Sequence, residues 1–414
     1  MLNERPKAVL ISVGGSPEPV VFSLNHQKPE HVCFFVSPET EASLRDKILP
    51  GLEFHPLHDL IRTPAAEDLS GCCRVLVREL PGILKKWGVQ PGELVVDYTG
   101  GTKTMSAALM LAAAELAGRF SYVGGTDRTK DGVGVVVDGK EKMWFSDNPW
   151  DELAVITRRE AEVLFNRGRY DAAAQAFRKI AQRVSDSRRP FYEDMARLAE
   201  AYEKWDRFAH SEAYGKLHSV AKALPRYAAF ASDKAIESLA ASVESHLDFL
   251  KTLREERDGE NTILDLLANA RRRALREGKY DDAVARLYRA VEAYAQWRLK
   301  SQYGVDTSAV EIQRIPEPFR EEIADGLSTE DGKLKLGLER SYRLLRAFGD
   351  AASRRFWSMW ESSLRGLLDR RNNSILAHGF VPITREDYEK FWEACLKFME
   401  ISTDRLPVFP ELEL

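Results

Sequence analysis

The sequence predicts an α/β domain with an open, mostly parallel sheet at the N-terminus, followed by all-helical middle and C-terminal domains. Short β-rich runs alternate with helical patterns over residues 1–147. After the polar, Pro-containing stretch SDNPWDEL at 146–153, Ala, Leu, Glu and Arg dominate and strand-like runs disappear. A chain of 414 residues is long enough for two or three domains.

The elements of the α/β domain follow one another as strand and helix. Three apolar runs are typical of buried strands: AVLISVG (8–14), HVCFFVS (31–37) and LVVDYTG (94–100). Helical patterns cover 68–88 and the residues after Thr102. SYVGGT (121–126) and VGVVVDG (133–139) are separated by Gly, Asp and Lys, which predicts a hairpin at the sheet edge. In such sheets ligands bind beyond the carboxyl ends of the strands.

The helical part contains two similar stretches, at 161–180 and 272–291. Each reads as a helix, a Gly-aromatic-Asp turn and a second helix. Their offset is far longer than the 34-residue repeat of tetratricopeptide arrays, so they are separate hairpins. Four aromatic residues of the second hairpin are expected in its core: Tyr280, Tyr288, Tyr294 and Trp297. The charged stretch at 253–261 predicts a boundary between a helical linker domain, 148–258, and a C-terminal domain, 259–414.

The overall charge gives no indication of nucleic-acid binding, because the net charge is −4 and a strong basic field is absent. The four cysteines form no CxxC pair, so neither a zinc site nor a disulfide framework is indicated. A reducing cytoplasm is the simplest setting for such a chain. We expect no signal peptide and no membrane contact, because no apolar run reaches about 18 residues.

The first candidate site is the turn between the strand at 94–100 and the Ala-rich helix. Two glycines allow its backbone to lie close to a ligand, and the first helical N–H groups favour an anion such as phosphate. Two hydroxyls and a cation complete the set: Thr99, Gly100, Gly101, Thr102 and Lys103. The turn matches neither the P-loop nor GxGxxG, so an ordinary helix-capping turn fits the spacing equally well. The loop GGSPEP at 14–19 leaves another strand at the same edge, and the two loops together favour a phosphate-binding pocket.

The second candidate site lies in DRRNNSILAHGF at 369–380. On a straight helix, Arg371 and His378 would be two turns apart and would face the same way. An Arg beside a His suits metal-free cleavage of RNA, because the Arg stabilises charge on the phosphate and the His moves a proton. Asn372 could hold the Arg or a phosphate in place. Alternatively, the Arg faces solvent and the His caps the helix before Gly379.

The surroundings of this second site favour RNA. Residues 331–380 contain ten Lys and Arg but only five Asp and Glu. Phe356, Trp357 and Trp360 lie among these basic residues. Basic and aromatic residues together are typical of an RNA-facing surface, although a basic helix face beside a buried aromatic stripe has the same composition.

Three stretches together resemble the CRISPR-associated proteins that join a CARF sensor domain to a HEPN ribonuclease domain, in the Cas02710-type branch. They are SVGGSPEPVVFSL, VVDYTGGTKTMSAAL and KYDDAVARLYRAVEAYAQWRL. DYTGGTKTM followed by RNNSILAHG is a specific combination, whereas either motif alone is not. The resemblance covers both ends of the chain, and the middle helices fit it more loosely.

The resemblance implies that residues 1–147 form a Rossmann-like CARF domain. Such domains bind a cyclic oligoadenylate, the second messenger of type III CRISPR systems, in a pocket shared by two protomers of a homodimer. The activator would be cyclic tetra- or hexa-adenylate, and no other cofactor is implied. The implied ligand-binding residues are Gly14, Gly15 and Ser16 after the first strand, Ser37 after the second, and Thr99, Gly100, Gly101, Thr102 and Lys103.

The resemblance also implies that the C-terminal domain is a HEPN endoribonuclease. In HEPN nucleases the motif is Arg, a polar residue and then His after four to six intervening residues, and Arg371, Asn372 and His378 match it with six. Each protomer supplies one Arg–His pair, and single-stranded RNA is cut without metal to leave a 2′,3′-cyclic phosphate. The expected function is therefore a cyclic-oligoadenylate-activated ribonuclease in antiviral defence. The alternative is a non-catalytic CARF regulator or scaffold that binds a cyclic nucleotide and a protein partner.

Overall fold

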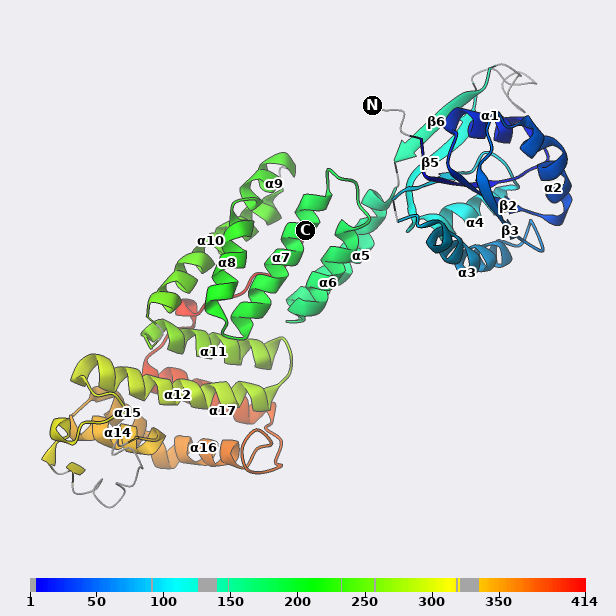
Figure 1. Ribbon diagram of the computed structural model, residues 1–414. Coiled ribbons are helices and arrows are strands. Elements are labelled where there is room, and N and C mark those ends of the chain that lie inside the picture. The colour runs from blue at the N-terminus through cyan, green and yellow to red at the C-terminus, as the bar shows by residue number, and fades with distance from the viewer. Residues whose placement is uncertain are drawn as a thin grey trace. The chain divides into compact units, whose positions relative to one another are not determined.

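The computed structural model describes residues 5–90, 92–125, 140–147, 149–231, 233–256, 258–317, 319–320 and 335–414. The chain divides into two compact units (Figure 1). The first contains the residues up to Arg158 together with Arg178–Glu193, and the second contains Arg159–Phe177 and Asp194–Leu414. The first unit is α/β and the second is helical, so the predicted fold class is confirmed. The finer division at residues 147 and 258 stays a prediction.

The α/β unit is built on a six-stranded sheet with the order β3-β2-β1-β4-β5-β6. The first five strands are parallel, and β6 is antiparallel to β5 at the edge. The strands are β1 (Ala8–Ser12), β2 (His31–Val36), β3 (Leu57–Arg62), β4 (Leu94–Asp97), β5 (Ala117–Gly124) and β6 (Lys142–Asp147). Because β1 and β4 are neighbours, the loops that follow them meet at one edge of the sheet.

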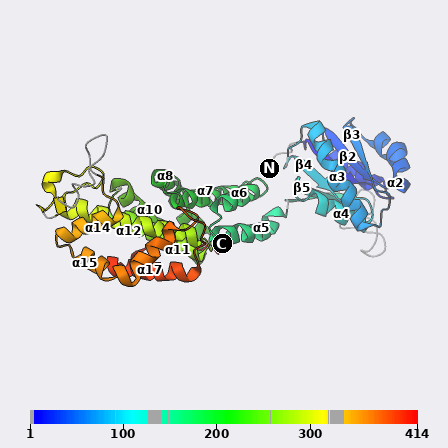
Figure 2. The same ribbon diagram turned by 90° about the horizontal axis from the view of Figure 1, so that it is seen from below.

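Helices cover both faces of this sheet, which explains why its central strands are apolar without alternation. Helices α3 (Leu69–Trp87) and α4 (Lys103–Ala113) pack against one face, as Figure 2 shows. The other face is covered by α1 (Glu18–Gln27) and by the short helices that follow α2 (Pro38–Ser43). All five residues of β1 are buried in consequence.

The sheet edge differs in part from the prediction. β5 contains the predicted SYVG and pairs antiparallel with Lys142–Asp147, which was not predicted as a strand, whereas the predicted VGVVVDG at 133–139 lies outside the described residues. The strand Leu57–Arg62 was not predicted, because only Ile61 of its six residues is buried and a short edge strand carries no apolar run.

The helical unit is organised around hairpins with glycine at the turn. Gly168 and Gly278, one in each predicted hairpin, have φ values of +74° and +67°, which favour glycine. The helices that follow β6 in the chain are α5 (Trp150–Asn166), α6 (Tyr170–Ala181), α7 (Arg189–Asp206), α8 (His210–Ala221), α9 (Leu224–Ala231), α10 (Lys234–Glu255), α11 (Glu260–Leu275), α12 (Tyr280–Tyr303), α14 (Leu338–Ala347), α15 (Ala351–Ser358), α16 (Arg365–Asn372) and α17 (Arg385–Met399). Within the described ranges, none is long and apolar enough to cross a membrane.

One core joins the helices after residue 260. Helices α11 and α12 lie side by side, and α14, α15 and α17 pack against the same core (Figure 1). Tyr294 is buried in it, and Tyr280, Tyr288 and Trp297 are partly buried against it, so the core prediction for these residues is confirmed. The central helix α12 thereby carries side chains to both the core and the surface next to α16.

The C-terminal tail closes the helical unit. Phe409 is 1% exposed, and its ring centroid lies 4.7 Å from that of Tyr202 and 4.8 Å from that of Trp205. Asn166 exchanges two hydrogen bonds with the backbone of Leu412, at 3.0 and 2.8 Å. The tail therefore contacts both α5, through Leu412, and α7, through Phe409.

Candidate functional site

The two predicted glycine loops touch each other at the carboxyl ends of β1 and β4. A Cβ on Gly14 would lie 2.5 Å from the backbone nitrogen of Gly101, and one on Gly100 would lie 2.4 Å from the carbonyl oxygen of Ser12. Gly101 also has a φ of +83°. Glycine at these positions is therefore required by the close approach of two backbones, whether or not a ligand binds.

Other groups at this edge face outward. Gly15 and Ser16 are exposed, and a Cβ on Gly15 would meet nothing within 4 Å. Lys103 is exposed at the first position of α4, and among the described residues it has no hydrogen bond or ion pair. The loop tip and this ammonium group are thus available to a ligand, at a helix terminus that favours an anion.

The predicted hydroxyl groups are occupied within the fold. Thr99 Oγ1 accepts a hydrogen bond from the N–H of Val123 at 2.9 Å. Thr102 is the N-cap of α4: its Oγ1 accepts from Met105 N at 3.2 Å and donates to the carbonyl of Ala66 at 2.8 Å. Ser37 is buried at the start of α2. These three side chains hold the shape of the edge, and Ser37 is covered in this structure.

Asp97, which was not predicted as a site residue, holds the start of the turn at Thr99 through its buried carboxylate. It is buried at the end of β4 and accepts hydrogen bonds from Ser23 Oγ at 2.6 Å, Ser121 Oγ at 2.8 Å and the N–H of Thr99 at 2.9 Å. Burial raises the pKa of Asp97, while these hydrogen bonds act in the opposite direction. An Asp that interrupts an apolar strand directly before Tyr-Thr-Gly-Gly was the signal that could have found it.

A row of aromatic rings borders the same edge. Tyr98 stacks on Tyr122 with a centroid distance of 5.2 Å, and Tyr122 stacks on Trp144 at 6.5 Å. Trp144 is 44% exposed and carries the Lys142 ammonium group 4.7 Å above its ring. Stacked rings of this kind offer a flat surface on which a nucleobase could stack.

The second candidate site forms in a different way from the prediction. Helix α16 ends at Asn372, so Arg371 and His378 do not share a helix face. Instead a turn folds the chain back, and the N–H of His378 donates to the carbonyl of Asn372 at 3.0 Å. Gly379 is required by this turn, because a Cβ there would lie 2.2 Å from the carbonyl oxygen of Asn373. The turn brings the backbone of His378 to the end of the helix, and its side chain is exposed.

Arg371 is held by two neighbours. Its guanidinium carbon lies 4.1 Å from the ring centroid of Tyr288 on α12, a cation–π contact, and its Nη1 donates to Asn372 Oδ1 at 3.1 Å. Its Nε is buried and has no partner among the described residues. The adjacent Arg370 is ion-paired with Asp387. Of these two adjacent arginines, Arg371 is therefore the one whose guanidinium group contacts Asn372.

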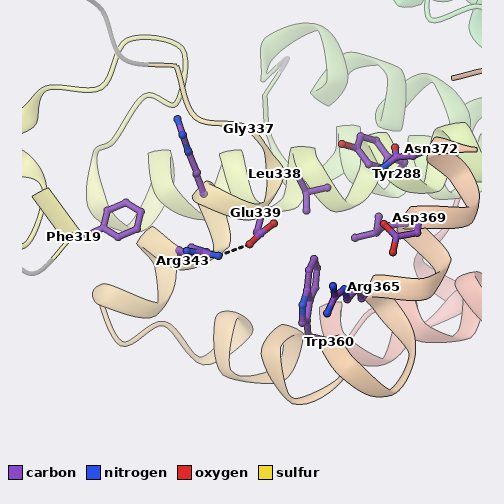
Figure 3. A pocket seen from close by; sticks show the side chains of 12 residues that line it. Tyr288, Phe319, Gly337, Leu338, Glu339, Arg343, Trp360, Arg365, Asp369 and Asn372 are labelled. Atoms are coloured by element: carbon purple, nitrogen blue, oxygen red, sulfur yellow. Dashed lines mark hydrogen bonds and ion pairs between the residues drawn. The ribbon is translucent and has the colours of Figure 1, made fainter. Parts of the chain in front are cut away.

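A cavity of about 870 Å³ opens next to these residues (Figure 3). Asn372 and Tyr288, which both contact Arg371, form part of its wall. Arginines, aromatic rings and two carboxylates form much of the remainder: Arg340, Arg343, Arg365, Phe319, Trp360, Glu339 and Asp369. In the part of the chain that the structure describes, no cluster of three or more His, Cys, Asp or Glu could hold a metal ion.

Comparisons with known proteins identify relatives over the whole chain. The Csm6 HEPN domain model matches residues 252–402, and the Csm6 6H domain model matches residues 153–250. The CRISPR system endoribonuclease Csm6 of Thermus thermophilus is 28% identical over 435 residues, which cover 98% of this chain and 89% of that protein. Among solved structures, Enterococcus italicus Csm6 bound to cyclic hexa-2'-fluoro-hexa-dAMP aligns with a TM-score of 0.60 at 11% identity, over 95% of this chain and 93% of that one. The last match shows a shared fold.

Proposed function

The chain belongs to the Csm6 family, and on this premise we propose that it is an endoribonuclease activated by a cyclic oligoadenylate. The observation that carries the proposal is the arrangement of the HEPN motif. Arg371 is stacked on Tyr288 and bonded to Asn372, and a turn returns His378 to the same helix end. The relationship to an endoribonuclease named Csm6 along nearly the whole chain supports the same conclusion.

Cleavage would proceed by transfer within the RNA. The 2′-oxygen attacks the neighbouring phosphorus, and the bond to the 5′-oxygen of the next nucleotide breaks. The 2′-hydroxyl loses a proton and the leaving 5′-oxygen gains one. His378 carries out one of these two transfers and solvent water the other, while Arg371 stabilises the charge on the phosphate. The products are a 2′,3′-cyclic phosphate and a free 5′-hydroxyl. No step requires a metal ion.

The activator would bind at the carboxyl edge of the parallel sheet. Gly15, Ser16 and Lys103 offer exposed groups there, and the touching loops at Gly14 and Gly100–Gly101 give a smooth floor for a phosphodiester ring. The cyclic hexanucleotide analogue bound to the Enterococcus relative supports a ligand of this class. Thr99, Thr102 and Ser37 would support the pocket mainly by shaping it.

We further propose a homodimer that acts in the cytoplasm, with a sensor domain over 1–147, a helical linker over 148–258 and the nuclease domain over 259–414. One Arg–His pair is half of a composite site, so a two-fold partner would complete it. Light scattering of the full chain should give twice the chain mass of 46.9 kDa. A monomer both with and without cyclic oligoadenylate would contradict the composite site.

The proposed function is tested by RNA cleavage in EDTA with no ligand, with cyclic tetra-adenylate and with cyclic hexa-adenylate. One of the rings should activate the wild-type protein, and His378→Ala should lower the rate by about 10²–10⁴. His218→Ala, which changes an exposed His on α8 in the same unit, serves as the control. If neither ring activates cleavage, a non-catalytic regulator that binds cyclic oligoadenylate becomes the better reading. A wild type that needs added Mg²⁺, or a His378→Ala variant that cuts at full rate, would contradict the metal-free HEPN mechanism.

A further inference from the structure

We propose that the cavity beside Asn372 is the groove that holds single-stranded RNA, with arginines on its phosphates and Trp360 stacked on a base. The proposal rests on the nuclease function above and adds the residues that hold the substrate. Figure 3 shows the labelled side chains extending from Phe319 at one end of the cavity to Tyr288 and Asn372 at the other. Because these last two residues contact Arg371, a strand in the groove leads to the proposed reacting group.

The charged residues of the groove leave positive charge available. Arg343 is paired with Glu339, at 2.6 Å. Arg340 is exposed and makes no ion pair with the described residues. Among the described residues Arg365 is paired only with Glu361, at 3.4 Å, and both side chains are largely exposed, so a phosphate could replace this contact. Arg340 and Arg365 are therefore the principal candidates for binding the RNA backbone.

The ring of Trp360 is held in place by two neighbouring aromatic rings, which suits it to stack on a base. Its ring packs against Phe356 and Trp357, with centroid distances of 5.4 and 5.1 Å, and the residue also lines the cavity. It begins a π-helical turn, Trp360–Leu364, in which the N–H of Arg365 donates to the carbonyl of Trp360. Such turns are frequent at functional sites. Here the turn puts an aromatic ring and a guanidinium group on one wall, a combination that binds single strands with little sequence preference.

The size and composition of the cavity favour RNA as its occupant. Its volume of about 870 Å³ lies within the range that encloses a small organic ligand, so it would take a short single-stranded segment and not a duplex. The carboxylates Glu339 and Asp369 also line the cavity, so the positive charge available for phosphate lies at Arg340 and Arg365. The backbone would therefore follow the arginine side, and a base would face Trp360.

RNA binding by the full chain tests the groove. The measurement is fluorescence anisotropy of a short labelled RNA of mixed sequence, in a His378→Ala background so that the RNA survives. Adding Arg340→Ala or Arg365→Ala should weaken binding about tenfold and lower the salt slope by about 0.7 each. Arg346→Ala is the matched control, because Arg346 is exposed on the same helix as Arg340 but does not line the cavity. Trp360→Leu should also weaken binding about tenfold, and Trp360→Phe should restore most of it.

The outcomes separate this proposal from the nuclease function. If the groove variants melt like the parent and bind RNA with parental affinity and salt slope, the groove is wrong, while activated cleavage by the wild type still supports the nuclease. If the wild type cuts no RNA but the groove variants lose RNA affinity, the nuclease proposal fails and the groove stands. A groove that prefers duplex RNA to the single strand, or variants that lose cyclic oligoadenylate instead of RNA, would also overturn the proposal.

Discussion

At the scale of single residues, Arg371 is held by packing before any substrate arrives. The Tyr288 ring supports the guanidinium group from α12, and Asn372 orients it from the same helix. Its buried Nε has no partner among the described residues, which leaves one donor unused. We therefore predict that Tyr288 positions the guanidinium group of Arg371 in addition to packing against the core.

Removing the ring should expose this role. We expect Tyr288→Leu to lower kcat for RNA about 10- to 100-fold, because a misplaced catalytic group costs far more rate than the lost contact itself. Tyr288→Phe keeps the ring face and should stay within a few-fold of wild type. Steady-state kinetics with saturating cyclic oligoadenylate measure both variants. Equal losses in the two, or a change in KM alone, would assign Tyr288 to the core only.

Lys103 offers a second residue-scale test, in the other unit. Lys103→Ala should weaken cyclic oligoadenylate binding about ten- to a hundredfold, the cost of about 1.5–3 kcal/mol for a lost charged hydrogen bond. The melting temperature should not change, because Lys103 makes no hydrogen bond or ion pair with the described residues. Isothermal calorimetry gives the affinity, with Lys85→Ala as an exposed lysine near the end of α3 for comparison. Unchanged affinity would remove Lys103 from the pocket.

At the scale of elements, the sequence predicts best the strands and helices whose burial produces a continuous apolar run or a periodic apolar pattern. The runs that became β1, β2 and β4 are apolar because helices cover both faces of the sheet. The strand Leu57–Arg62 was missed because an edge position buries only Ile61. The turn after Asn372 was predicted to be helical, because the local sequence pattern allows two more helical turns. The close approach of Gly379 to the backbone of Asn373, which the turn requires, follows from no rule of residue spacing.

The C-terminal tail is an element that sequence patterns do not mark, because it is neither helix nor strand, yet it fills the core of the helical unit. Phe409 contacts Tyr202, Trp205 and the guanidinium group of Arg272, which lies 3.7 Å from its ring centroid. Phe409→Ala should cost about 3–5 kcal/mol of the free energy of unfolding. Urea unfolding followed by circular dichroism measures this. Val408→Ala is the matched control, because Val408 is 64% exposed, and similar losses in both variants would refute a specific anchoring role.

At the scale of the whole molecule, the two proposed sites lie in different compact units of the chain. The glycine loops belong to the unit that contains the sheet, and the Arg371–His378 motif belongs to the helical unit. Substitutions in one site should therefore leave the intrinsic chemistry of the other unchanged and affect only the coupling between them. Stability is also divided in this way, because each unit has its own buried core.

The stability of the helical unit should depend on pH through His246. Burial lowers the pKa of His246 to about 4, and the nearby Arg272 acts in the same direction, whereas a backbone hydrogen bond to Val408 opposes it. Between pH 4 and the ordinary value of 6.5, the unfolded chain binds a proton that the folded chain does not. The contribution of neutral, buried His246 to the free energy of unfolding is thus complete above about pH 6.5. It is lost as the pH falls toward 4, by about 1.4 kcal/mol per pH unit.

Going from pH 7 to pH 5 should therefore cost about 2 kcal/mol of unfolding free energy through this one group. His246→Asn keeps a partner for the Tyr202 hydroxyl, which lies 2.8 Å from His246 Nδ1 in the structure. The variant should be less stable at pH 7 but should lose less stability on acidification. Urea unfolding of both proteins at pH 7, 6 and 5 gives the difference directly, and other titrating groups cancel in it. Parallel pH profiles for the two proteins would show that His246 is protonated equally in the folded and unfolded states, contrary to its burial beside Phe409 and Trp205.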